Sequence, residues 1–147
     1  MELNPLTALS PIDGRYARQT DALRDIFSEC AFMNARVRVE VEWLISLSEA
    51  GFAELPHLSD HGKAFLRGLA DNFSLADCEA IKEIEKTTNH DVKAVEYWIK
   101  NQVAHDEELK SASEFVHFSC TSEDINNTSH AIMLKRGREA LADYLQQ

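Results

Sequence analysis

The sequence predicts an all-α protein, and three observations lead to this prediction. Apolar residues recur at spacings of three and four over most of the chain, which is the periodicity of one helix face. Residues suited to helix capping stand directly before several of these stretches. No run of useful length alternates with the period of two that a half-buried strand requires. The 147 residues have the size of one ordinary domain, which is enough to bury a core.

The longest expected helix lies between Asp21 and Glu49. Ser28 followed by Glu29 resembles a second helix start, so we expect a kink or a break there. Gly51 provides a stop signal at the far end. The apolar stripe of this helix consists of Leu23, Ile26, Phe27, Cys30, Met33, Val37, Val41, Leu44 and Ile45.

Three further helices should follow, each with its own start signal. Ser59 precedes the first, and Ser74 with Asp77 resembles a capping box in front of the second. The third begins near Asp91. The inward-facing residues are expected to be Phe65, Leu66, Leu69, Ile81, Ile84, Val92, Val95, Ile99 and Val103.

A last helix is expected to begin with the capping residues Thr121 to Asp124 and to run to the end of the chain. No stop signal closes it, which suggests a chain cut inside an element. An apolar stripe without a partner is unfavourable in water, so we expect this helix either to fray beyond about Leu134 or to pack on a second copy. The stripe consists of Ile125, Ile132, Leu141 and Leu145.

Charge and composition exclude several classes of partner. Acidic residues outnumber basic ones 25 to 15, and the formal net charge is -10. Nucleic acid and anionic membranes both attract a basic surface, so neither is expected as a partner. A small anionic ligand remains compatible, because it needs only one or two local cations. No apolar stretch approaches the length of a membrane span, and Met1 to Pro5 do not resemble a signal peptide.

The cysteines and histidines predict neither disulfides nor a metal site. Cys30, Cys78 and Cys120 are odd in number, far apart and free of CxxC spacing, so we expect three reduced thiols in the cytoplasm. His57 and His61 have helical spacing, but no third ligand is near in sequence.

Three polar segments stand out from the helical background. The first is Ser10 to Tyr16, where Pro11-Ile12-Asp13-Gly14 is typical of a turn with glycine at positive φ. Arg15 after this turn offers a planar fork for an oxyanion, with the hydroxyl of Tyr16 beside it. The alternative is an ordinary surface turn with a solvated arginine.

The second and third polar segments each precede a helix. In Thr87 to Asp91, either Asn89 or Asp91 could cap the helix, which leaves His90 for a ligand or for plain solvent. Ser119 to Asn127 contains more hydroxyls than one cap requires, and a helix start binds carboxylate or phosphate well. We therefore expect the two helix starts to border one groove, with the ring of His90 and the hydroxyl of Thr121 facing the same region.

Taken in order, three stretches resemble the adenylosuccinate lyase family of the fumarase/aspartase superfamily. They are "SPIDGRY", "KTTNHDVKAVEY" and "FVHFSCTSEDINNTSHAIMLK", and the resemblance covers the whole chain. It implies an N-terminal all-α domain over residues 1–118. Residues 119–147 would begin the first long helix of a central helical bundle. The whole enzyme would be a cytoplasmic homotetramer whose subunits share their active sites.

The resemblance also implies the chemistry. Members of the family release fumarate by β-elimination from adenylosuccinate, giving AMP, and from succinylaminoimidazole carboxamide ribotide, giving aminoimidazole carboxamide ribotide. No cofactor or metal takes part. The catalytic histidine acid and serine base would lie C-terminal to Gln147, so this chain alone should be inactive. The matching residues imply contacts to the phosphate end (Arg15, Tyr16), to the substrate generally (Asn89, His90, Asp91) and to a succinyl carboxylate (Thr121, Ser122).

Two alternatives stay open at the level of sequence. Another lyase of the superfamily would act on a different succinyl compound, and an arginine suited to phosphate in "DGRY" argues against a substrate without phosphate. A non-catalytic helical binding module is the other alternative. Such a module should end its last helix with a stop signal, which is missing here.

Overall fold

The computed structural model describes residues 4–55 and 57–146, and it contains helices and turns without a strand in those ranges. The all-α prediction is therefore confirmed. In chain order the elements are η1 (Asp21–Leu23), α1 (Arg24–Phe27), α2 (Glu29–Glu49), α3 (Asp60–Asp71), α4 (Leu75–Thr88), α5 (Asp91–Val103), α6 (Glu107–Ala112), η2 (Ser113–Phe115) and α7 (Ser122–Leu145).

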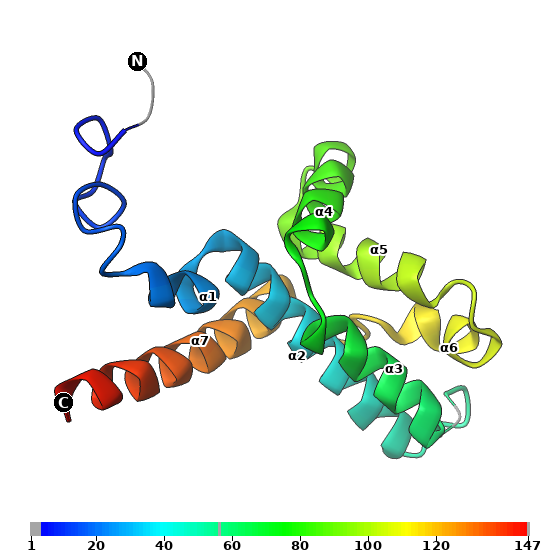
Figure 1. The fold of residues 1–147 in the computed structure, drawn as a ribbon. Coiled ribbons are helices and arrows are strands. Elements are labelled where there is room, and N and C mark those ends of the chain that lie inside the picture. Colours follow the sequence, from blue (N-terminus) through cyan, green and yellow to red (C-terminus); the bar gives the residue numbers. More distant parts are fainter. Residues whose placement is uncertain (1–3, 56, 147) are drawn as a thin grey trace.

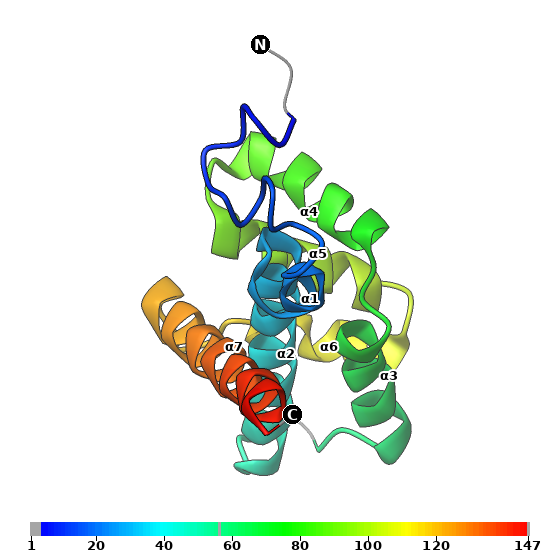
Figure 2. The same ribbon diagram turned by 60° about the vertical axis from the view of Figure 1, so that its left-hand side comes forward.

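Helix α2 is the centre of the fold. It packs against α1, α3, α4, α5 and α7, while α4 and α5 form an antiparallel pair beside it (Figure 1). Turning the molecule shows α7 crossing α2 on the side away from α3 (Figure 2). The core lies where the predicted stripes meet. Its fully buried members include Val37, Val41, Leu44, Leu66, Ile81, Val95, Ile99 and Val103.

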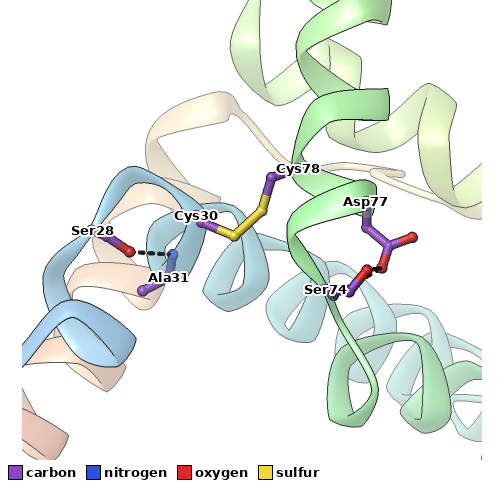
Figure 3. Close-up of a disulfide and its surroundings, with 6 residues drawn as sticks. All are labelled: Ser28, Cys30, Ala31, Ser74, Asp77 and Cys78. Atoms are coloured by element: carbon purple, nitrogen blue, oxygen red, sulfur yellow. Dashed lines mark hydrogen bonds between the residues drawn. A yellow bond between two sulfur atoms is a disulfide. The ribbon is translucent and has the colours of Figure 1, made fainter. Parts of the chain in front are cut away.

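The predicted helix starts are confirmed by their hydrogen bonds. Ser28 is extended and separates α1 from α2, and its side chain accepts a bond from the N–H of Ala31. Ser59 caps α3 by accepting from Gly62. Ser74 and Asp77 form the expected capping box of α4, with the Ser74 N–H donating to the Asp77 carboxylate at 2.8 Å (Figure 3). These caps satisfy N–H groups that no helix can satisfy internally.

The prediction of three reduced thiols is wrong in this structure. Cys30 of α2 and Cys78 of α4 form a disulfide, with their Cα atoms 5.7 Å apart (Figure 3). The two residues are 48 positions apart in sequence, and only the packing of α4 on α2 brings them together. Cys120 is free and half-buried.

Helix α7 continues to Leu145, so of the two expected outcomes the structure does not show fraying beyond Leu134, and packing on a second copy stays a prediction. Its first half is anchored, since Ile125 is buried against the body of the fold. Its second half carries exposed leucines: Leu134, Leu141 and Leu145 are 65%, 52% and 88% exposed. The predicted domain border between residues 118 and 119 falls in the connection from η2 to α7, and it stays a prediction. Among the described residues, no helix combines the length and the apolar character needed to cross a membrane.

Candidate functional site

The second polar segment forms the connection between α4 and α5. Asn89 ends α4 in the left-handed region, at φ 50°. His90 is the N-cap of α5, because its Nδ1 accepts a hydrogen bond from the Lys93 N–H at 3.2 Å. The expectation that Asn89 or Asp91 caps this helix is therefore wrong. The bond to Lys93 fixes the ring of His90, so that Nε2 points away from the helix it caps.

Asp91 is held by a cation from another helix. Its Oδ2 accepts a bond of 2.6 Å from Nη2 of Arg36 in α2, and its Oδ1 accepts from the N–H of Val92. Burial acts to raise the pKa of the Asp91 carboxyl, but the Val92 N–H and the Arg36 guanidinium together lower it below its usual value. Asp91 is thus ionised and tied to the scaffold.

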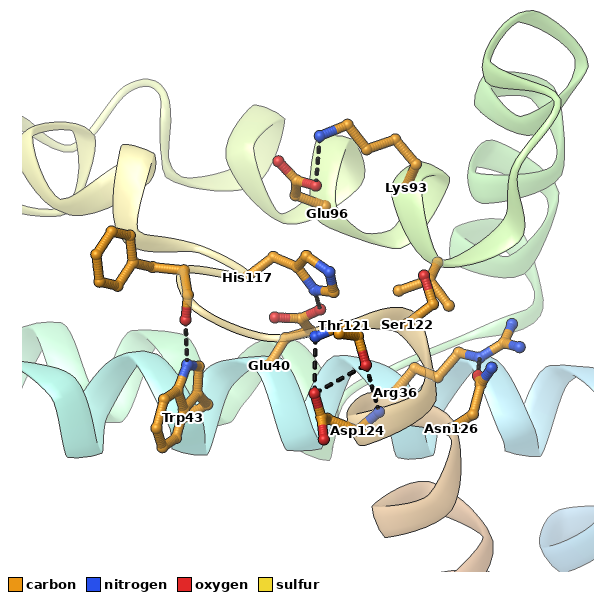
Figure 4. A network of polar contacts seen from close by, with 12 residues as sticks. Arg36, Glu40, Trp43, Lys93, Glu96, His117, Thr121, Ser122, Asp124 and Asn126 are labelled. Atoms are coloured by element: carbon orange, nitrogen blue, oxygen red, sulfur yellow. Dashed lines mark hydrogen bonds and ion pairs between the residues drawn. The ribbon is translucent and has the colours of Figure 1, made fainter.

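The third polar segment forms the start of α7. Thr121 and Asp124 make a capping box: the Thr121 N–H donates to the Asp124 carboxylate at 2.8 Å, and the Thr121 hydroxyl accepts from the Asp124 N–H at 3.3 Å (Figure 4). The Thr121 N–H, and the Thr121 hydroxyl as a second donor at 2.9 Å, both donate to the Asp124 carboxylate and lower its pKa. The hydroxyl of Thr121 is therefore engaged within its own helix start, as ordinary capping requires.

Ser122 connects the two helix starts. Its Oγ lies 3.4 Å from Nε2 of His90, which places the start of α7 directly beside the start of α5. The two helix starts are therefore adjacent, but the residue beside His90 is Ser122 and not Thr121 as expected. The expected single groove bordered by both starts is not found in the two hollows nearest to them, since one has no α7 residue in its lining and the other no α5 residue. At the same helix start, the N–H groups of Ser122 and Glu123 meet no acceptor among the described residues. Such groups favour a carboxylate.

Backbone strain is concentrated in the two connections that lead to this place. The described residues contain three non-glycine positions with positive φ: Asn89 at 50°, His117 at 65° and Ser119 at 60°. Asn89 precedes α5, and the other two precede α7. Left-handed backbone at ordinary residues is unfavourable and is enriched at functional sites. Its location supports a binding role for the two helix starts.

A buried acid–histidine pair supports the segment before α7. Glu40 of α2 is 1% exposed, and its Oε1 lies 2.5 Å from Nδ1 of His117. Burial raises the pKa of the Glu40 carboxyl, although the bond to His117 acts in the opposite direction. Nearby, the indole of Trp43 donates to the carbonyl of Phe118 at 2.8 Å (Figure 4). Helix α2 therefore fixes this connection at two points.

Sequence reasoning missed the buried residues whose hydrogen bonds support the two helix starts. Arg36, Glu40 and His117 have partners 55, 77 and 77 positions away, so no local motif reveals them. One signal was present in the sequence. Arg36 and Glu40 stand four residues apart among the apolar positions of α2, where charged side chains are rarely buried without partners.

Two hollows adjoin the helix starts. One, of about 370 Å³, lies beside the second polar segment and is lined by Glu29, Phe32, Arg36, Glu85, Asn89, His90 and Asp91. Another, of about 560 Å³, runs between α2 and α7 and includes Trp43, Cys120 and Ile125 in its lining. Burial, followed by the nearby acids, raises the pKa of the Cys120 thiol, so this cysteine is not activated as a nucleophile.

The first polar segment lies elsewhere. Nη2 of Arg15 donates to the Tyr16 hydroxyl at 2.6 Å, and its guanidinium carbon lies 4.5 Å from the centre of that ring. Both side chains are exposed, and Figure 1 shows the N-terminal segment (residues 4–20) well apart from the starts of α5 and α7. Gly14 does not have the expected positive φ. Glycine is required there because a Cβ would come within 2.8 Å of the Pro5 carbonyl.

No group of three or more potential metal ligands is present in the described parts of the chain. Asp91 and Asn126 are already bonded to Arg36, and the groups that remain without an acceptor in the described residues are the N–H donors of Ser122 and Glu123. This arrangement suits an anionic organic ligand.

Residues 14–147 match a family model described as lyase. The chain belongs to this lyase family. It is 56% identical over 142 residues to the adenylosuccinate lyase of Vibrio cholerae, and the aligned region covers 96% of this chain and 31% of the relative. The corresponding protein of Haemophilus influenzae is 56% identical over 140 residues, with 95% and 31% covered. That of Escherichia coli K12 is 52% identical over 149 residues, with 100% and 33% covered.

The chain thus spans about a third of the length of these curated relatives. The family match agrees with the resemblance given by the three polar segments. All of them lie within residues matched to the lyase family, apart from the first four residues of the first segment.

Proposed function

We propose that this chain is the N-terminal part of an adenylosuccinate lyase. The observation that carries the proposal is the contact between His90 and Ser122, which joins two helix starts within the matched lyase region. The names of the relatives supply the substrate. The complete protein would convert adenylosuccinate to AMP and fumarate, and succinylaminoimidazole carboxamide ribotide to aminoimidazole carboxamide ribotide and fumarate.

The reaction breaks one C–N bond. A base removes a proton from the succinyl carbon next to a carboxylate, and negative charge develops on that carboxylate. The electron pair forms the C=C bond of fumarate while an acid protonates the departing nitrogen. Donors placed around the carboxylate stabilise this charge and accelerate the step. In this proposal, the acid and the base are a histidine and a serine outside the present chain.

Within this chain, the start of α7 would hold the succinyl carboxylate. The N–H groups of Ser122 and Glu123 and the hydroxyl of Ser122 are the available donors, because the Thr121 hydroxyl is engaged with Asp124. Thr121 would act through its backbone and its cap. His90 would reach the ligand through Nε2, and Asn89 and Asp91 would line the substrate beside it.

Arg15 and Tyr16 would bind the phosphate end, but the N-terminal segment that carries them lies apart from the helix starts in one chain (Figure 1). The proposal therefore includes the homotetramer, in which the N-terminal segment of one subunit would complete a site of another. Sedimentation of the complete protein tests this part. A monomer with full activity would contradict it.

The proposed location is the cytoplasm. The disulfide between Cys30 and Cys78 argues against this location, because the cytoplasm is reducing. Alkylation of thiols in freshly lysed cells, followed by peptide mass analysis, decides between these observations. A cytoplasmic protein should show Cys30 and Cys78 alkylated. Recovery of the linked peptides would place the protein in an oxidising environment.

The test of the activity uses the complete open reading frame and follows fumarate release by absorbance. Adenylosuccinate should be turned over, and the 147-residue chain alone should give no more fumarate than a sample without protein. Argininosuccinate and malate serve as alternative substrates. Turnover of either in preference to adenylosuccinate would assign the chain to another lyase of the superfamily, and no turnover at all would favour a binding module.

A further inference from the structure

Arg36 is the buried residue at which three helices meet. Its side chain is 6% exposed and extends from α2 toward the starts of α5 and α7. Nη2 donates to Asp91 of α5 at 2.6 Å, and Nε donates to the side-chain oxygen of Asn126 in α7 at 2.9 Å. Figure 4 shows the bond to Asn126 close to Ser122. One planar group therefore connects the two helix starts.

The plane of the guanidinium is itself held in place. Its carbon lies 3.8 Å from the centre of the Phe32 ring, and this ring stacks on His130 of α7 at 4.5 Å. Phe32 thus packs against the guanidinium of Arg36 and also contacts α7, the helix that contains Asn126. A flexible ammonium on a lysine stem would make neither the fork nor the stacked contact.

This geometry has a consequence for His90 and Ser122. Asp91 follows His90 directly, and Asn126 lies one helical turn beyond Ser122 on the same face of α7. Holding Asp91 and Asn126 to one group therefore fixes the distance between Nε2 of His90 and Oγ of Ser122, which is 3.4 Å.

We propose that Arg36 is a positioning residue. Through its bonds to Asp91 and Asn126 it aligns His90 with Ser122 for substrate binding, and it does not itself touch the substrate. This inference rests on the proposed function of the two helix starts. It predicts that both the fork of Arg36 and the acceptor oxygen of Asn126 are needed, whereas charge alone is insufficient.

The test uses variants of the complete protein. Arg36→Lys keeps the charge and removes the fork, and kcat/KM should fall about 10- to 100-fold because the binding groups shift relative to each other. Asn126→Asp keeps the acceptor and should retain activity, while Asn126→Leu should lose it to a similar extent as Arg36→Lys. Arg67→Gln is the matched control. Arg67 also joins two helices, through bonds of 2.8 and 2.9 Å to Glu42, and within the described residues it forms no hydrogen bond or ion pair with α5 or α7.

Hydrogen–deuterium exchange provides a readout that does not depend on activity. Arg36→Lys and Asn126→Leu should accelerate exchange in residues 88–92 and 122–126, and Arg67→Gln should not. Unchanged exchange and unchanged kcat/KM in both variants would overturn the proposal, as would equal losses in Asn126→Asp and Asn126→Leu. If Arg36→Lys fails to fold, the two Asn126 variants decide. If the wild-type protein releases no fumarate, the proposed function fails, and exchange alone decides the role of Arg36.

Discussion

The starts of α5 and α7 and the N-terminal segment carry equally conspicuous polar motifs, yet the fold holds them differently. At the α2–α5–α7 junction (Arg36, His90, Asp91, Ser122 and Asn126), side chains are tied to a buried cation. In the N-terminal segment, Arg15 and Tyr16 bond to each other and are exposed. The junction is therefore preorganised within one chain, whereas the N-terminal pair would need an additional surface to form the site proposed for it.

A polar motif in the sequence therefore does not show by itself how firmly the fold holds its side chains. What distinguishes the two regions is the support behind the motif. The junction has Arg36, and the connection before α7 has Glu40 and His117, all three of them anchored on or bonded to α2. The N-terminal segment meets the rest of the fold through η1 and α1.

The largest expected contrast is in stability. His117→Ala leaves the carboxyl of Glu40 buried without its partner, and the free energy of unfolding should fall by about 3 kcal/mol. Arg15→Ala removes only exposed contacts and should change it by less than about 0.5 kcal/mol. Urea denaturation of the chain measures both. Similar values for the two variants would remove the distinction between the regions.

Arg15→Ala should have a small effect on stability but a large effect on catalysis. In the complete protein, Arg15→Ala should weaken transition-state binding by about 1.5 to 3 kcal/mol through loss of a charge-assisted bond to phosphate. Arg15→Lys should recover only part of this loss, because it lacks the fork. Arg18→Ala, in the same exposed segment, is the control. The phosphate role is ruled out if kcat/KM is the same in Arg15→Ala and in the control.

The attachment of α1 to α7 can be disturbed without touching the junction. A Cβ on Gly137 of α7 would come within 2.3 Å of Cζ of Phe27 in α1, so Gly137→Ala should destabilise the chain by about 1 to 3 kcal/mol. At Gly68 in α3 the nearest atom is 3.7 Å away, and alanine there should stabilise by about 0.5 to 1 kcal/mol. Thermal melts of the two variants check the signs. A stabilising Gly137→Ala would mean that Phe27 does not pack there.

The smallest effect concerns pH. The pKa of Asp91 is lowered, so its contribution to stability is present above the ordinary value of 3.8 and is lost as the pH falls through the folded value. The pKa of Glu40 is raised, so stability should instead decrease as the pH rises from 4.5 through the folded value. Asp91→Asn should reduce the loss of stability at acid pH. Glu40→Gln should reduce the loss of stability that occurs as the pH rises above 4.5. Chemical denaturation at a series of pH values measures how the free energy of unfolding changes with pH. A substitution that made this change steeper in its own pH range would contradict the sign predicted for that residue.

Local signals in the sequence predicted the elements well, because caps and turns depend on neighbouring residues. Ser59, Ser74 and Thr121 all cap the helices expected of them. The break at Ser28 follows from the same chemistry. His90 was misjudged, since its ring nitrogen performs the capping that a neighbouring asparagine or aspartate was expected to perform.

What could not be predicted depends on contacts between distant parts of the chain. Arg36 meets Asn126 across 90 positions, and Cys30 meets Cys78 across 48. Glu108 shows the same limit, because its carboxylate accepts bonds from the N–H and hydroxyl of Ser59, 49 positions away at the start of α3. Only the packing of the helices decides such pairs.

Arg36 is proposed to hold the start of α5 against the start of α7 through its bonds to Asp91 and Asn126. A nuclear Overhauser experiment can test this between the ring protons of His90 and the β protons of Ser122, whose polar atoms lie 3.4 Å apart. The wild-type chain and Arg67→Gln should both give this cross-peak, and Arg36→Lys should lose it while the peaks of the core persist. A wild-type chain without the cross-peak, or an Arg36→Lys variant that keeps it at full intensity, would show that Arg36 does not hold the two helix starts together.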